Sequence, residues 1–122
     1  MMEPEQISNL TQAKTYDDYY REGWALHGSK KDEDAAEENF RQAIAINPKS
    51  VDAYYGLGLV LKAQDRRQDA ISAFQKVIEL LETQPGEDRS RTQMIRRLSI
   101  GHMNMMKKGD WDLEKEIWKR VE

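Results

Sequence analysis

The chain has 122 residues, 34% charged and 39% apolar, and a net charge of −3 at pH 7. This length favours a single domain, and the low content of proline (three) and glycine (seven) argues against an all-β fold. The absence of cysteine excludes disulfides, thiolate metal sites and cysteine nucleophiles. The start, MMEPEQISNL, lacks the regions of a signal peptide, and the longest apolar run is far shorter than the ~20 residues that span a bilayer. We therefore expect a cytoplasmic protein.

In chain order, the pattern predicts a flexible lead-in over residues 1–12 and one helical domain over 13–122. Pro48 ends one helical segment and TQPGED ends another, because proline cannot extend a helix. The four amphipathic helices expected before that second break cover residues 14–27, 34–46, 51–63 and 67–82.

The helices form a repeat. Gly23 recurs as Gly58, 35 residues later, within YYREGWALHG and YYGLGLVLKA, whereas Phe40 recurs as Phe74, 34 residues later. The extra residue falls in the polar stretch GSKKDED, which predicts a solvated turn. The sequence therefore predicts hairpins over residues 14–48 and 49–84.

A third, degenerate unit is predicted over residues 88–122. Its first helix would cover 88–107, with Gly101 in the place of Gly58, and KKGDWD would be its turn. The last helix would then carry Leu113 and Ile117 on its apolar side. Three hairpins are about the minimum for a stable stack, since each buries its apolar faces against its neighbours.

The repeated residues of the hairpins over 14–48 and 49–84 resemble the tetratricopeptide repeat. That repeat has an aromatic residue and a Leu-Gly pair on its first helix, and a small residue before an aromatic one on its second. Glu22 departs from the pattern, which has an apolar residue there. The resemblance implies an all-α fold, a right-handed α-α superhelix of three helix-turn-helix hairpins. It also implies that the first helix of each hairpin lines a concave surface.

Helical spacing separates the two tyrosines of each pair. Tyr19 shares a face with Gly23 and Leu26 and is expected inside, whereas the second tyrosine lies about 100° away. The second stripe would face the groove and bind a partner. Its residues are Tyr20, Trp24, His27, Tyr55, Leu59, Lys62, Leu98, His102 and Met105. The alternatives are that the lead-in or the last helix covers this stripe, or that it forms a homodimer seam.

Known grooves of this family that hold a C-terminal carboxylate use asparagines and basic residues. The matching positions here are Trp24, Leu59 and His102. We therefore expect the partner to be another protein that offers an apolar or amphipathic segment, with this chain acting as an adaptor or assembly factor.

The segment 89–108 is basic and rich in methionine, with six cations and no acid. It could bind phosphates, an anionic membrane surface or an acidic partner, or its apolar side chains could simply be core beneath solvated cations. Without a nucleic-acid motif and with negative net charge, DNA or RNA binding is not favoured. The possible basic patch comprises Arg89, Arg91, Arg96, Arg97, Lys107 and Lys108.

The last predicted helix carries Trp111 and Trp118 at the edge of its apolar side, so it packs on the methionine-rich helix or forms a homodimer contact. We expect no metal, no cofactor and no catalysis. His27 and His102 stand alone without a spaced ligand set, and no nucleophile has a neighbouring base.

Overall fold

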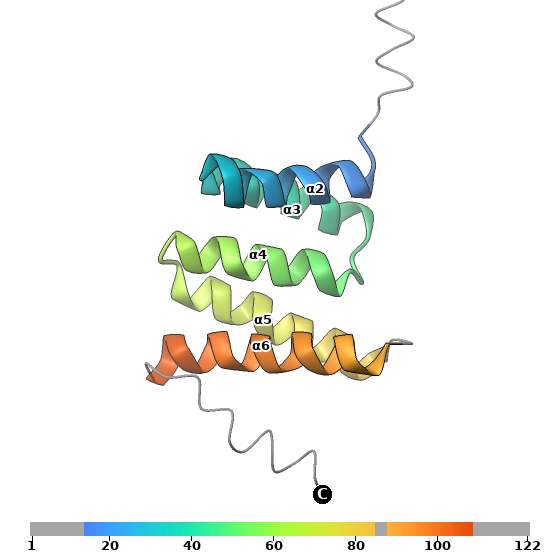
Figure 1. The fold of residues 1–122 in the computed structure, drawn as a ribbon, viewed down its shortest axis with the longest axis vertical. Helices are drawn as coiled ribbons and strands as arrows, with labels where there is room; N and C mark the ends of the chain where they lie inside the picture. The colour runs from blue at the N-terminus through green and yellow to red at the C-terminus, as the bar shows by residue number, and fades with distance from the viewer. Residues whose placement is uncertain (1–13, 85–87, 109–122) are drawn as a thin grey trace, which may run out of the picture.

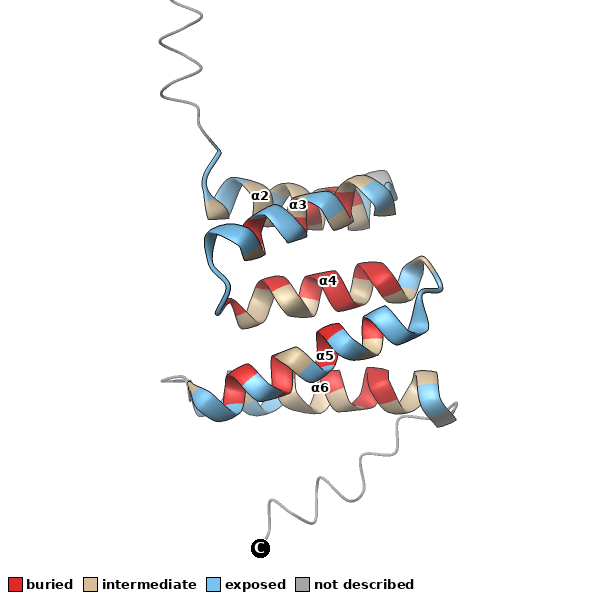
Figure 2. Ribbon diagram, turned by 180° about the vertical axis from the view of Figure 1, so that it is seen from behind, coloured by how far each residue is buried: buried red, intermediate tan, exposed pale blue. Residues whose placement is uncertain are grey.

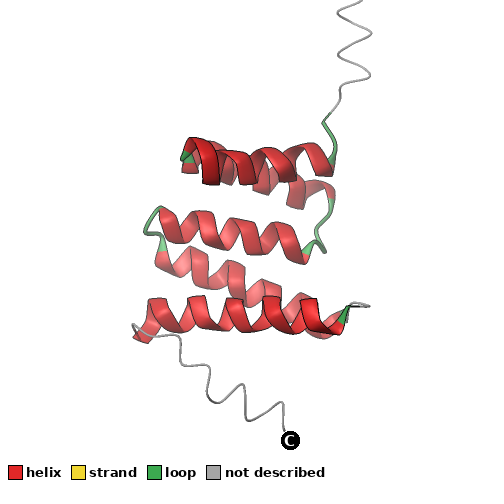
Figure 3. Cartoon of the chain, in the orientation of Figure 1, coloured by secondary structure: helices red, strands yellow, loops and turns green. Residues whose placement is uncertain are grey.

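The computed structural model describes residues 14–84 and 88–108, and these residues form helices and turns (Figure 3). The described helices are α2 (Tyr16–Ala25), a π-helical turn η1 (Leu26–Lys30), α3 (Glu33–Ile46), α4 (Val51–Ala63), α5 (Arg67–Thr83) and α6 (Arg89–Lys108). The predicted helices are confirmed to within about two residues at each end, except that the first passes into the π turn. The predicted lead-in and the last helix of the third unit lie outside the described residues.

The helices stack as hairpins. α2 packs on α3, α3 on α4, α4 on α5 and α5 on α6, so each element contacts its neighbours in the sequence. Figure 1 looks onto α2, α4 and α6, and Figure 2 shows α3 and α5 in front when the stack is seen from behind. The fold is therefore the expected all-α stack of helical hairpins, with the first helix of each unit on one side.

Two phenylalanines hold the stack together. Phe40 on α3 and Phe74 on α5 are fully buried. A Cβ added at Gly23 would lie 3.0 Å from the Phe40 ring, and one at Gly58 would lie 2.8 Å from the Phe74 ring. The glycines thus let the two helices of each hairpin approach closely, as expected. Phe40 also meets the next hairpin, because a Cβ at Gly56 would come within 2.5 Å of the same ring.

Side-chain caps explain where α2, α3 and α4 begin. The Thr15 hydroxyl accepts a hydrogen bond from the Asp18 N–H while the Asp18 carboxylate accepts one from the Thr15 N–H, which is a capping box at the start of α2. Asp32 caps α3 by accepting a hydrogen bond from the Ala35 N–H, and Ser50 caps α4 in the same way through the Ala53 N–H. The acids of GSKKDED therefore serve the start of α3, where Asp32 is the cap and Glu33 and Asp34 lie in the first turn.

The additional residue of the first unit is taken up in the π turn. In the second hairpin Asp65 adopts the left-handed conformation (φ 60°), and the Arg66 N–H donates to the Leu61 carbonyl. In the first hairpin the left-handed residue is Lys31 (φ 52°), and both its N–H and that of Asp32 donate to the carbonyl of Leu26. Leu26 and Leu61 occupy equivalent places, so the two turns share one design and differ by one residue.

Leu26, expected inside, is buried, and so are its counterpart Leu61 and the small residues Ala36 and Ala70, each of which precedes a core phenylalanine by four residues. Tyr19 differs, because it is only half-buried, lies outside the core clusters and has the Lys14 ammonium 5.4 Å from its ring centroid. Its counterpart on α4, Tyr54, is also half-buried, but Tyr54 packs against the buried side chains of Val77, Leu81 and Ile95 on α5 and α6.

Candidate functional site

The predicted stripe on α2 is a chain of aromatic rings that rests on the core. Tyr20 and Trp24 are half-buried and meet edge to face with their centroids 6.1 Å apart. Both rings also stand edge-on to Phe40, at 6.2 and 5.3 Å. Burial raises the pKa of the Tyr20 phenol, so this side chain is neutral at physiological pH. His27 ends the stripe in the π turn, where its Nδ1 donates to the Glu33 carboxylate at 2.8 Å.

Sequence reasoning missed one member of this stripe, Tyr16. Its ring stacks on Tyr20 with centroids 5.6 Å apart, and its hydroxyl lies 2.6 Å from the Ser50 hydroxyl, which caps α4. The signal was present, because Tyr16 precedes Tyr20 by four residues and i,i+4 residues share a helix face. The stripe on α2 therefore covers three aromatic side chains, and its first member ties α2 to the start of α4.

The stripe on α4 repeats this arrangement around the second phenylalanine. Tyr55 is half-buried and meets Phe74 with the ring centroids 5.8 Å apart, and burial raises the pKa of its phenol. Leu59 is half-buried and packs against the same core cluster. Lys62, one turn further on, directs its ammonium to His102 on α6 at 3.0 Å.

His102 joins the stripes of α4 and α6. It is only 9% exposed and stacks on Phe74 at 5.0 Å, so the structure buries a residue that the sequence placed toward the groove. Lys62 can only donate, so the histidine Nδ1 accepts, and the Nε2–H then donates to the Tyr55 hydroxyl at 3.3 Å. Burial, and then the nearby Lys62 charge, lower the pKa of His102 to about 4. The neutral ring is therefore a fixed part of this face.

The other two predicted residues of α6 lie at the margins of the site. Leu98 and Met105 are half-buried. Met105 lines a hollow of about 290 Å³ together with Met106, Lys62 and residues of the turn between α4 and α5. The structure thus brings the α2 and α4 stripes together with His102, and leaves Leu98 without a described role.

The predicted basic patch is less open than its sequence suggests. Arg91 is ion-paired with Asp52 on α4. Arg96 and Arg97 are half-buried, and the Arg97 Nε is buried without a hydrogen-bond partner in residues 14–84 and 88–108. Arg89 and Lys107 are exposed, and the side chain of Lys108 is outside the described part. Among the apolar residues of this helix, Ile95 and Met103 are core while Met94 is 54% exposed.

The predictions for the end of the chain are not tested. Trp111 and Trp118 lie outside the described residues, and so does the lead-in that could cover the groove. Homodimer formation and self-coverage therefore stay predictions. In the described part of the chain no three His, Asp or Glu side chains gather as a metal site would require, and none of its helices is long and apolar enough to cross a membrane.

Comparison with known proteins agrees with this architecture. Residues 29–65 match a family described as TPR repeat, and residues 52–80 match one described as tetratricopeptide repeat. The two matches overlap on α4 and together take in α3, α4 and most of α5, which are the helices that carry Phe40, Gly58 and Phe74. No curated protein and no solved structure matched the chain. The glycine–phenylalanine contacts, the hairpin stack and these matches together show that residues 29–80 form tetratricopeptide repeats.

Proposed function

We propose that this chain is a protein-interaction module that binds an apolar or amphipathic segment of a partner protein across α2, α4 and α6. Tetratricopeptide-repeat domains generally mediate protein–protein interaction and typically act as non-enzymatic scaffolds. The coarse function follows from the family, whereas the groove, its residues and the role as a cytoplasmic adaptor are our proposal.

The observation that carries the proposal is the pair of half-buried stripes on neighbouring helices. Tyr20 and Trp24 contact Phe40, and Tyr55 contacts Phe74, so the core holds one side of each ring while part of the ring stays accessible. Large rigid side chains of this kind are typical interface anchors, since binding costs them little conformational entropy. Leu59 extends the apolar surface between them.

The polar groups near these stripes favour an amphipathic partner over a purely apolar one. Asp52 on α4 is partly exposed and carries its ion pair with Arg91 of α6 next to the stripes. Phenol hydroxyls of neutral Tyr20 and Tyr55 can donate or accept hydrogen bonds at the edge of the surface. A helix or extended segment with one apolar side would satisfy both kinds of group.

The test is site-specific photo-crosslinking in lysate of the source cells. A photoreactive amino acid replaces Leu59 in one sample and Ala45, exposed on α3, in the matched control. We expect one or a few proteins to crosslink from position 59 and not from position 45. A synthetic peptide from the crosslinked region of such a protein should then bind the purified chain and lose affinity for a Tyr20→Glu, Tyr55→Glu double variant.

Because both tyrosines touch core phenylalanines, circular dichroism and thermal unfolding must first establish that the double variant is folded. The proposal fails if the same proteins crosslink from both positions, if none crosslinks from position 59, or if the folded double variant binds the peptide as well as the original chain does.

A further inference from the structure

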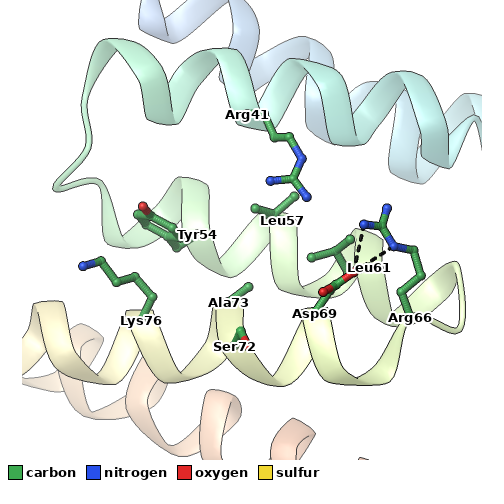
Figure 4. Close-up of a pocket in the computed structure, with 9 residues that line it drawn as sticks. All are labelled: Arg41, Tyr54, Leu57, Leu61, Arg66, Asp69, Ser72, Ala73 and Lys76. Atoms are coloured by element: carbon green, nitrogen blue, oxygen red, sulfur yellow. Dashed lines mark hydrogen bonds and ion pairs between the residues drawn. The ribbon is translucent and has the colours of Figure 1, made fainter.

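On the side of the stack opposite to the stripes, a pocket of about 320 Å³ opens between α3 and α5 (Figure 4). Both helices pack on α4, which forms the floor with Leu57 and Leu61, while Ala73 of α5 adds a small apolar wall. All three of these side chains belong to the buried core, at 4%, 2% and 6% exposure. The volume is at the small end for ligand pockets, so it suits one anchoring side chain better than a whole small molecule.

The rim of this pocket is cationic. Arg41 reaches down from α3, Lys76 comes from α5 on the side of Tyr54, and Arg66 stands at the far end (Figure 4). Against these three cations the lining contains one carboxylate, Asp69. An apolar floor beneath a positive rim is complementary to an apolar side chain with acidic neighbours.

The ion pairs show which cations are available. Arg66 is fully engaged, since it donates to Asp69 through Nε and Nη2 and to Glu37 through Nη1. Arg41 uses its Nε for Glu37 at 2.8 Å, which leaves its two terminal nitrogens without a hydrogen bond within the described residues. Lys76 has no ion pair or hydrogen bond in that part of the chain and is half-buried beside the pocket. Two sets of donors therefore remain for a ligand.

We propose that this pocket is a second binding site, which takes an acidic peptide segment of another protein. One aromatic or aliphatic side chain enters over Leu57 and Ala73, and carboxylates on either side of it accept hydrogen bonds from Arg41 and Lys76. The engaged Arg66 closes the end of the pocket as a fixed wall. The site does not depend on the proposed groove, because none of its lining residues belongs to the stripes.

The probe is a fluorescein-labelled peptide with one phenylalanine between two glutamates in a glycine–serine background. Its binding is measured by fluorescence anisotropy and, with the unlabelled peptide, by amide chemical shifts of the isotope-labelled chain. We expect amide shifts at Leu57, Ser72 and Ala73, with little change along α2. The matched peptide with glutamines in place of the glutamates should bind at least fivefold more weakly.

Lys76→Gln should weaken the acidic peptide three- to tenfold, in line with the modest strength of partly exposed charge pairs. Lys49→Gln is the matched control, because Lys49 is exposed and lies outside the pocket, and it should change the affinity less than twofold. Neither change removes an ion pair within the described residues, so both variants should unfold at the temperature of the original chain.

Five results would overturn the proposal. The first four are no binding of the acidic peptide, equal binding of its glutamine form, equal effects of Lys76→Gln and Lys49→Gln, and shifts confined to the α2 and α4 stripes. Displacement of the peptide by an equal concentration of inorganic phosphate would also refute it, because the site would then recognise an anion and not a peptide. Failure here leaves the crosslinking result at position 59 untouched, so the two proposals are judged separately.

Discussion

A single methyl group at Gly56 should disturb the contact between the first two hairpins. The Cβ of Gly56→Ala would lie 2.5 Å from both Cε1 and Cζ of Phe40. The ring has little room to retreat, because it is fully buried and also faces Gly23 on α2, where an added Cβ would lie only 3.0 Å from it. The helices α2 and α4 must therefore separate around the ring, or the ring must leave its favoured rotamer.

The size of the effect follows from two opposing terms. Ordinary carbon–carbon contacts are about 3.5–4.0 Å, so the overlap to be relieved is about 1 Å. Overpacking of a core costs about 1–3 kcal/mol, and a ring held from both sides puts Gly56→Ala near the upper end. Alanine is favoured over glycine in a helix by about 1 kcal/mol. The net loss in free energy of unfolding is therefore about 2 kcal/mol, which lowers the melting temperature by roughly 10 °C in a domain of this size.

Urea and thermal unfolding followed by circular dichroism would measure this loss. Gly28→Ala is the matched control, since a Cβ there meets nothing within 4 Å, and its stability should be unchanged or slightly higher. In the double variant Gly56→Ala, Phe40→Leu, the smaller leucine side chain makes room for the added methyl group. The double variant should therefore lose less free energy of unfolding than the two single variants lose together. If Gly56→Ala is as stable as Gly28→Ala, the proposed close contact between α4 and Phe40 is wrong.

Three other predictions follow. Lys31→Gly should raise the free energy of unfolding by about 0.5–1 kcal/mol in urea titrations, because Lys31 holds a left-handed conformation (φ 52°) that glycine adopts without steric cost; an unchanged or lower stability would contradict this. The pKa of His102 in the folded protein, about 4, lies below its value of about 6.5 in the unfolded chain. The neutral ring therefore stabilises the fold fully above pH 6.5, and the free energy of unfolding falls by up to about 1.4 kcal/mol per pH unit as the pH drops toward 4. That loss should be absent from His102→Asn, and the same slope in both proteins would refute the assignment. Ser50→Ala should cost about 1–2 kcal/mol in thermal unfolding, since Ser50 caps α4 through the Ala53 N–H and is buried, whereas a loss below a few tenths would show that water replaces the cap.

The repeat in the sequence was enough to predict the helices and the hairpin contacts. Gly23 and Phe40 recur at nearly constant spacing, and recurrence of small and large residues on facing helices is what close packing requires. The same spacing revealed one additional residue in the first unit but not its conformation, because a π turn depends on which carbonyl the following N–H groups reach. Tyr19 was misjudged, since a shared helix face does not show which side chains of other helices will meet the ring, and Tyr19 lies outside both core clusters.

The candidate site was predicted in part. Helical spacing correctly grouped Tyr20 with Trp24, but these side chains lie at the boundary between core and surface, where an angle of about 100° cannot decide how much of a ring is exposed. His102 shows the same difficulty more strongly, because its burial depends on how α6 crosses Phe74. The pocket around Lys76 could not be predicted, since it depends on how closely the side chains of three consecutive helices pack, which their spacing in the sequence does not give.

The π turn after α2 has a consequence for how such arrays change in length. The carbonyls of Leu26 and Leu61 accept the hydrogen bonds that close the two turns in the same way. The inserted residue therefore enlarges one hydrogen-bonded ring, and the helices that follow keep their orientation. A change in the length of this turn therefore does not alter how the rest of the stack packs. A hairpin of 34 residues could replace the first unit, or one residue could be removed between Leu26 and Lys31, and the helices that follow would keep their orientation and their exposed surfaces.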